Sequence, residues 1–345
     1  MKLDGTLIAG LSDVGQRVRD LEDLGYDGAV SVDTSHDPFL PLLLAAEHSR
    51  RLELITGVAI AFARNPMSTA YVANDIQAHS QGRLRLGLGS QVRPHIERRF
   101  SMPWSHPAPR MREYITAMRA IWRSWATGEK LDFRGDFYQH TLMTPFFNPG
   151  ANPHGPPPVF LGALGERMAE VAGEVADGIM VHPMATERFI RECTVPALTR
   201  GLARAGRSRD GFEICLTPFI VSGADEEAIS GSRTVVRQQI AFYGSTPAYR
   251  SVLDLHGCGE LQGELNLLSK QGRWTEMGEL ISDDMLAVFA VEAPLDVIAA
   301  AVRERVGDIA DRLSFYLAWE DDRDRWRGVI EALRQGTRAE AVSRV

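Results

Sequence analysis

Apolar and polar positions follow two different periods along the chain. Short runs that are apolar almost throughout, such as Leu54 to Phe62, precede segments in which apolar residues recur every three or four positions, such as Val14 to Leu24. A continuous apolar run is typical of a parallel strand covered on both faces, and the longer spacing is typical of an amphipathic helix. The pattern therefore predicts β-α units.

Eight strands are predicted in this way, at about residues 3–9, 27–32, 54–62, 83–88, 159–161, 178–181, 212–221 and 313–317. Eight strands separated by helices favour a closed (β/α)8 TIM barrel, although a doubly wound open sheet would share the local pattern. We expect one domain over residues 1–345 with two insertions. The first, about 128–157, contains a short β excursion around Phe137 to Met143, and the second, about 243–280, covers the barrel mouth.

Composition and charge exclude several classes of function. The 345 residues are 44% hydrophobic and carry a formal net charge of -7, with no run of Lys and Arg that could follow a nucleic-acid backbone. Three widely spaced cysteines fit reduced thiols, and no spacing typical of a metal site or of a Walker phosphate loop occurs. Acids at Asp4 and Asp13 interrupt any signal-peptide core, so we expect a cytoplasmic protein without a membrane partner or a bound metal.

Two neighbouring blocks carry a family resemblance. The block Asp75 to Ser90, DIQAHSQGRLRLGLGS, resembles the fourth-strand signature of the luciferase-like monooxygenases, and Gly57 to Pro66 is similar to the third strand of that family. The resemblance implies a TIM barrel with a non-prolyl cis peptide within Gly57 to Ile60, beside the flavin ring. The family has a bulge at this cis peptide, and the resemblance further implies that residues around the bulge and at the end of the fourth strand contact the cofactor, namely Ala59, Ile60, Arg64, Asn65 and Gly89. For Arg64 and Asn65 the alternative is an ordinary turn, which Asn-Pro also favours.

A third block, Pro157 to Gly178, resembles the fifth strand, phosphate turn and following helix of the same family. Glycines at 162 and 165 let the backbone approach a ligand, and the amides that open a helix attract an anion. The ordinary alternative is a structural turn between a strand and a helix. With the resemblance, we expect the cofactor phosphate to bind at Gly162, Ala163, Leu164 and Gly165.

The stretch Gln91 to Trp104 is similar to the branch of the family that uses the deazaflavin coenzyme F420. Ser35-His36 follows the second strand where relatives place Asp-His, so the resemblance makes His36 an active-site acid, base or ring partner. An imidazole can donate or accept a proton near neutral pH, although a loop histidine held in a turn is the alternative. Ser35 in the place of Asp leaves the reaction of those relatives open here.

Further candidates lie in loops at the predicted mouth. Glu97, with His95 beside it, lies where some relatives carry an acidic proton donor, although a solvated surface loop explains both residues equally well. Trp104 and His106 could form a wall of the substrate pocket, or could simply pack under the first insertion. His182 follows the sixth strand and is expected to line the coenzyme site.

The resemblance implies a coenzyme F420-dependent oxidoreductase that transfers a hydride between the deazaflavin and a small organic substrate. It also implies a homodimer, since relatives are commonly dimers. An FMN-dependent monooxygenase of the same fold is the first alternative. A catalytically silent flavin-binding protein is the alternative from another class, suggested by the missing Asp before His36.

Overall fold

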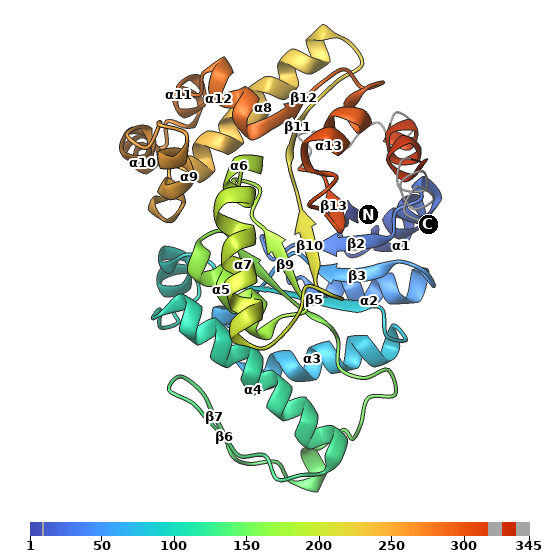
Figure 1. Ribbon diagram of the computed structural model, residues 1–345. Helices are drawn as coiled ribbons and strands as arrows, with labels where there is room; N and C mark the ends of the chain where they lie inside the picture. Colours follow the sequence, from blue (N-terminus) through green and yellow to red (C-terminus); the bar gives the residue numbers. More distant parts are fainter. Residues whose placement is uncertain (9, 317–325, 336–345) are drawn as a thin grey trace.

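The computed structural model of the protein describes residues 1–8, 10–316 and 326–335. Its centre is a closed barrel of eight parallel strands, in which neighbours pair in the order β3-β2-β1-β13-β10-β9-β8-β5 and a β3–β5 pairing closes the circle (Figure 1). The barrel strands are β1 (Lys2–Thr6), β2 (Gly28–Ser31), β3 (Glu53–Thr56), β5 (Leu84–Gly89), β8 (Val159–Ala163), β9 (Gly178–Val181), β10 (Glu213–Leu216) and β13 (Arg312–Ser314). The predicted TIM barrel is confirmed.

Short strands and helices complete the chain. The remaining strands are β4 (Ala59–Ile60), β6 (Phe133–Arg134), β7 (Gln139–His140), β11 (Phe219–Val221) and β12 (Ala290–Glu292). The helices are α1 (Val14–Leu24), α2 (Phe39–His48), α3 (Pro66–His79), α4 (Pro107–Thr127), α5 (Glu166–Val175), α6 (Glu187–Phe189), α7 (Val195–Arg204), α8 (Glu226–Gly244), α9 (Arg250–Leu255), α10 (Leu261–Gln271), α11 (Trp274–Glu279), α12 (Asp283–Phe289) and α13 (Ile298–Val306). Within the described residues, no helix is long and apolar enough to cross a membrane.

Local sequence signals set several helix ends. Gly25 ends α1 with a φ of 89°, a left-handed conformation that glycine adopts without steric cost. Asn65 caps α3 by accepting a hydrogen bond from the Ser68 amide, and Pro66 occupies the first turn, where its missing amide is harmless. Asp225 caps α8 by accepting from the Ala228 amide at 2.8 Å. These caps fix where each helix meets the barrel.

The predicted seventh strand is divided in the structure. β10 ends at Leu216, and β11 pairs instead with β12, outside the barrel. Pro218 lies between them and has no amide to donate, so it interrupts the ladder. The chain therefore leaves the barrel near Pro218, earlier than the predicted insertion at 243–280. Leu317, the last residue of the predicted eighth strand, lies outside the described residues.

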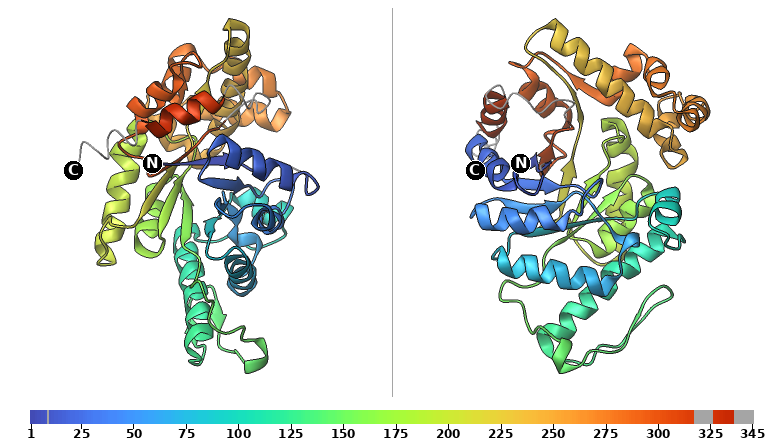
Figure 2. Two further views of the ribbon diagram at one scale, coloured as in Figure 1. Left: turned by 90° about the vertical axis from the view of Figure 1, so that its right-hand side faces the viewer. Right: turned by 180° about the vertical axis from the view of Figure 1, so that it is seen from behind.

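Two segments extend from opposite ends of the molecule (Figures 1 and 2). The excursion from β11 to β12, which contains α8 to α12, stands over one end and encloses a second apolar core that includes Met184, Phe219, Val236, Ile240, Val252 and Leu265. The β6–β7 hairpin projects at the other end, within the predicted insertion at 128–157, and starts a few residues earlier than the predicted excursion.

Helices α5 and α7 lie in unusually close backbone contact. A Cβ added at Gly201 would lie 2.0 Å from the Glu170 carbonyl oxygen, and one at Gly173 would lie 2.5 Å from the Leu198 carbonyl oxygen. Real Cβ atoms do not approach backbone atoms so closely, so both positions require glycine. The contact holds α5, which begins at the predicted phosphate turn, against the next helix of the outer layer.

Candidate active site

The carboxyl ends of the barrel strands surround a partly exposed mouth. Side chains of a strand alternate between its two faces, so the inward-pointing positions can be read from known contacts. Met180 of β9 points inward, because it lies beside the positions that Cβ atoms of Gly57 and Gly87 would occupy. Two residues further on, His182 therefore also points inward. Barrel enzymes place their chemistry at this end of the strands.

The peptide bond between Gly57 and Val58 is cis, as predicted from the third-strand resemblance. The Val58 side chain lies over the ends of two neighbouring strands, where Cβ atoms on Gly89 and Gly162 would come within 2.6 and 3.0 Å of it. These two glycines thus leave room for the bulge. Ala59 and Ile60, predicted to contact the cofactor, are buried, and the Ile60 amide donates to Asp33 at 3.0 Å.

The turn from Gly162 to Gly165 opens helix α5 at the rim of the mouth. Gly165 has φ −68° and ψ 150°, and nothing lies within 4 Å of the position that its Cβ would occupy. No side chain caps this helix, and the Met168 amide donates to the Gly165 carbonyl, which leaves the amides before Met168 as those that can face an anion. Ala163 and Leu164 are buried, which leaves their backbone as the part that a ligand could reach. The turn fits an anionic group.

Arg64 and Asn65, predicted to contact the cofactor, both have partners within the protein. The Arg64 guanidinium pairs with Asp33 at 2.5 Å and with Asp37 at 2.9 Å, and also donates to the Ile60 carbonyl. Burial alone would lower the pKa of Arg64, but hydrogen bonds to the two carboxylates outweigh it and raise the pKa. Asn65 is used as the cap of α3. Their role toward a cofactor stays a prediction.

His36 and Glu97 lie in two loops that contact each other. His36 is exposed in the loop after β2, and Arg99, from the loop after β5, donates to the carbonyl of Thr34 in the His36 loop. Glu97 is also at the surface, where Arg93 binds its carboxylate at 2.9 Å. The structure therefore brings the two predicted catalytic loops together, and the roles of both side chains stay predictions.

Trp104 and His106 take different positions. Trp104 is half-buried and packs edge-on against Phe62, with 5.4 Å between ring centroids. His106 is exposed, and its ring lies 5.9 Å from that of Phe137 in the first insertion. Trp104 thus packs on the chain that follows the bulge, and His106 packs on the inserted hairpin. Neither contact tests their predicted place in the substrate pocket.

His182 belongs to an aromatic group that the sequence did not predict. Its ring lies 4.7 Å from Tyr243 and 4.6 Å from Tyr249, centroid to centroid, and its Nδ1 accepts from the Met184 amide at 3.1 Å. Burial lowers the pKa of His182 to about 4, so the ring is neutral at physiological pH. Tyr316, which follows the last barrel strand β13, joins the group through its hydroxyl, 3.0 Å from that of Tyr243. Only the position of His182 after a strand pointed to this site.

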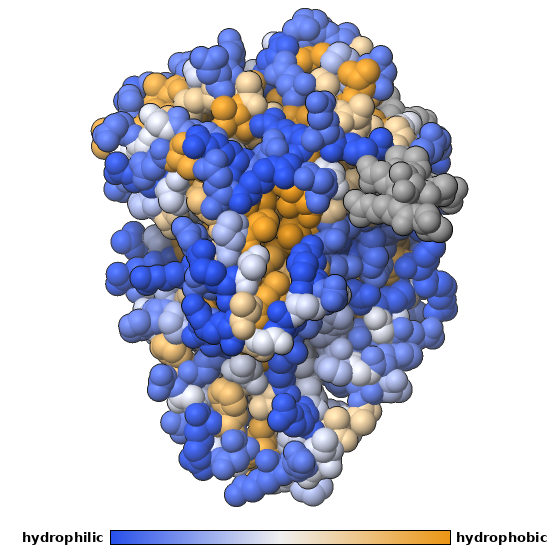
Figure 3. Space-filling model, in the orientation of Figure 1, coloured by the Kyte–Doolittle hydropathy of each residue, from blue (hydrophilic) through white to orange (hydrophobic). Residues whose placement is uncertain are grey.

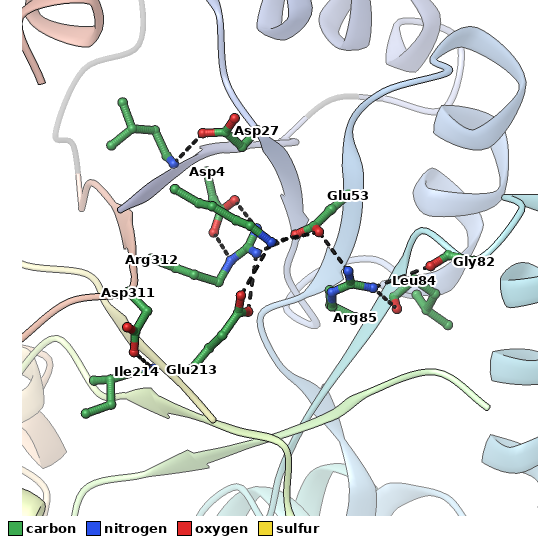
Figure 4. Close-up of polar contacts among 12 residues, drawn as sticks. Asp4, Asp27, Glu53, Gly82, Leu84, Arg85, Glu213, Ile214, Asp311 and Arg312 are labelled. Atoms are coloured by element: carbon green, nitrogen blue, oxygen red, sulfur yellow. Dashed lines mark hydrogen bonds and ion pairs between the residues drawn. The ribbon is translucent and has the colours of Figure 1, made fainter. Parts of the chain in front are cut away.

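The opposite end of the barrel interior is filled by charges (Figure 4). Arg312 is fully buried and binds both oxygens of Asp4, at 2.6 and 2.8 Å. Glu53 accepts from Arg312 and, at 2.7 Å, from Arg85. Burial alone would raise the pKa of Glu53, but these two guanidinium groups outweigh it and hold the pKa below its usual value. Glu53 and Arg312 start their strands, and conserved groups at this end of a barrel usually serve stability more than chemistry.

A largely apolar cleft beside the barrel shares His182 with the candidate site, and Glu187 and Arg305 also line it. It lies between α6 and α13 and is lined by Val181, Ile190, Leu216, Phe289, Val291 and Val306, and Figure 3 shows apolar surface at this place. Val181 and Leu216 alternate with inward-pointing neighbours, so they point outward from the barrel. The cleft therefore extends behind β9 and β10, and His182 is where it meets the candidate site.

Comparisons with known proteins agree with this geometry. The chain is 54% identical to an uncharacterised protein of Mycobacterium tuberculosis over 313 residues, which are 91% of this chain and 92% of the relative. It is 27% identical to a 5,10-methylenetetrahydromethanopterin reductase of Archaeoglobus fulgidus, over 82% of both chains. The coenzyme F420-dependent tetrahydromethanopterin reductase of Methanopyrus kandleri superposes with a TM-score of 0.76 at 19% identity, over 96% of both chains.

A family model supplies the assignment. The model described as luciferase-like monooxygenase matches residues 3–312, which include the barrel strands apart from Lys2 of β1 and the last two residues of β13. The resemblance found in the three sequence blocks is confirmed, and so is the expectation of an oxidoreductase at the level of the family. The chain belongs to the luciferase-like monooxygenase family.

Proposed function

We propose that the protein is a coenzyme F420-dependent oxidoreductase that acts on a small organic molecule. The observation that carries the proposal is the open backbone turn at Gly165, which offers uncapped helix amides to an anion beside the Gly57–Val58 bulge. The ring of a deazaflavin could pack against the apolar bulge at Val58, and its phosphate could accept hydrogen bonds from the amides at the start of α5. The reductase of Methanopyrus kandleri, named as dependent on this coenzyme, supports the choice.

Residues of this chain would hold the cofactor at three points. The Gly162–Gly165 backbone and the first turn of α5 would bind its phosphate, with the exposed Arg167 beside them. Val58 would lie against the ring, and the exposed His36 would reach its edge. The cofactor would supply hydride transfer, while the barrel orients the substrate and excludes water.

The test is a titration of the purified protein with oxidised coenzyme F420 and, separately, with FMN. We expect the deazaflavin to bind at least tenfold more tightly, a difference of about 1.4 kcal/mol. Fluorescence of each cofactor reports its binding. Equal or tighter binding of FMN would move the assignment to the first alternative, an FMN-dependent monooxygenase; the matched family is described as a monooxygenase family.

A further inference from the structure

Aromatic residues form one side of the mouth, across the barrel from the bulge. In the circle of eight strands, β10 lies four positions from β3, which leads into the Gly57–Val58 bulge. Beyond β10 and its neighbours β9 and β13 lie His182, Phe219 and Tyr316. The rings of Tyr243 and Tyr249, from the helical excursion, complete what we call the aromatic wall. A molecule bound between the bulge and the aromatic wall would contact both.

Hydroxyl groups of the aromatic wall form a short chain. Tyr316 donates to Oε1 of Gln239 at 3.1 Å, and its oxygen lies 3.0 Å from the Tyr243 hydroxyl. A phenol has one proton, so with that bond made, Tyr243 donates to Tyr316 and its own oxygen can accept from a ligand. If Tyr316 donates to Tyr243 instead, the Tyr243 proton is free for a ligand. The pair can therefore present either an acceptor or a donor.

The wall carries no charge of its own. Burial lowers the pKa of His182 to about 4, and burial raises the pKa of both Tyr243 and Tyr249, so all three groups are neutral near pH 7. Hydrogen bonds and ring contacts join the aromatic wall to Met184, Phe242 and Gln239, all uncharged, while the charged Glu187 and Arg305 line the cleft that also contains His182. A phosphate ester would lose its hydration here and find no cation on the wall.

We propose that the aromatic wall selects the substrate, and that the substrate is an uncharged alcohol or carbonyl compound on an apolar or aromatic frame, with its oxygen hydrogen-bonded to Tyr243. This inference rests on the proposed function. The oxygen of such a compound is a donor as a hydroxyl and an acceptor as a carbonyl, which matches the two states of the Tyr243–Tyr316 pair. Interconversion moves one hydride, exchanged with the cofactor, and one proton, exchanged with solvent.

The experiment uses the full chain with coenzyme F420 bound and two probes that share a phenyl ring. Acetophenone is uncharged and carries a carbonyl group, and phenyl phosphate is an anion. Ligand-observed NMR measures the dissociation constant of each probe, and absorbance follows oxidation of the reduced cofactor by acetophenone. We expect acetophenone to bind at least tenfold more tightly than phenyl phosphate. Tighter binding of phenyl phosphate would overturn the inference.

Variants test the hydroxyl separately from the ring. Tyr243→Phe keeps the ring, and we expect it to weaken acetophenone binding about tenfold, the usual effect of one neutral hydrogen bond. The matched control is Tyr71→Phe, because the Tyr71 hydroxyl donates to the Phe147 carbonyl on the outer surface. We expect the control to change binding less than twofold. Unchanged binding in Tyr243→Phe would remove Tyr243 from the substrate site.

A cofactor titration keeps this inference distinct from the proposed function. If the deazaflavin binds and acetophenone does not, the substrate class is wrong while the proposed function stands. If the deazaflavin does not bind, the proposed function fails, and the same two probes are titrated against the protein alone. Loss of acetophenone binding only in Tyr243→Phe would then still support the aromatic wall, and equal binding to all variants would contradict it.

Discussion

The polar groups at the two ends of the barrel interior differ in kind. The amino end is closed by ions, with the fully buried Arg312 bound by the buried Asp4 and by Glu53. At the carboxyl end, Arg64 pairs with Asp33 beside the bulge, but the opposite side is lined by neutral rings and hydroxyls and remains partly exposed. Ions that satisfy one another hold strands together and leave nothing for a ligand. Neutral groups with unused hydrogen-bonding capacity can bind a ligand.

The largest expected effect is the loss of stability when the ion pairs at the amino end are removed. Arg312→Met would leave Asp4 buried without its bidentate partner, and we expect the free energy of unfolding to fall by about 3–5 kcal/mol. Urea denaturation followed by circular dichroism measures it. Lys2→Met is the control, since Lys2 pairs with Glu53 at 2.9 Å but is 41% exposed, and should cost less than about 1 kcal/mol. Similar losses in both variants would contradict the contrast between the ends.

Acid should lower the stability of the fold through protonation of His182 at the carboxyl end. Its pKa is about 4 in the fold against an ordinary 6.5, so the folded protein binds fewer protons than the unfolded chain between these values. The stability that the neutral ring contributes is therefore complete above pH 6.5 and lost as the pH falls toward 4. The difference is up to about 3 kcal/mol.

The measurement is the melting temperature between pH 7 and 4 for the native protein and His182→Phe. We expect a shallower fall in the variant, because phenylalanine keeps a ring against Tyr243 and Tyr249 but does not titrate. The control is His95→Gln at an exposed position, and its melting temperature should depend on pH as that of the native protein does. Parallel profiles for the native protein and His182→Phe would show that acid acts elsewhere.

A charge at the mouth should act on binding without acting on folding. Gly165 has an extended backbone that any residue adopts and open space for a Cβ, so Gly165→Asp should fold normally. A carboxylate there would repel the cofactor phosphate, and we expect affinity for coenzyme F420 to fall by roughly 1–3 kcal/mol. Gly165→Ala adds the Cβ alone and should bind nearly as the native protein does. Unchanged affinity in Gly165→Asp would place the phosphate elsewhere.

The smallest expected effect concerns Glu97. Its pair with Arg93 is an exposed i,i+4 contact, so Glu97→Gln should change the free energy of unfolding by less than about 0.5 kcal/mol. If Glu97 is also a proton donor, turnover would fall while the melting temperature stays constant. Thermal melts and cofactor oxidation rates, measured on one preparation, separate the two roles. A large loss of stability would mean that Glu97 supports the loop.

The sequence predicted the barrel because its signals are local. Each strand and helix shows its period within a dozen residues, and the bulge and phosphate turn lie inside contiguous blocks. Contacts between distant segments were not predicted. Asp4 and Arg312 are 308 positions apart, and the sequence around either residue does not indicate which residue pairs with it. A charge on an otherwise apolar strand is the available signal, since such a group must be paired when buried.

The aromatic wall was missed for the same reason. Tyr243 and Tyr249 lie in a segment of mixed polarity that was predicted only as an insertion, and 61 positions separate His182 from Tyr243. The break at Pro218 could have been predicted, because proline cannot donate to a strand ladder. That break sends the chain out of the barrel and brings α8 over the mouth.

The contact between α5 and α7 constrains how this site can change over time. Gly173 and Gly201 face backbone carbonyls of the opposing helix, so a side chain at either position would push the two helices apart. Because Gly165 is the N-cap residue of α5, that movement would also shift the amides at the mouth. Neither glycine touches a ligand, yet selection on ligand binding would act on both. Surveys of natural variation should therefore find this pair as invariant as residues of the site itself.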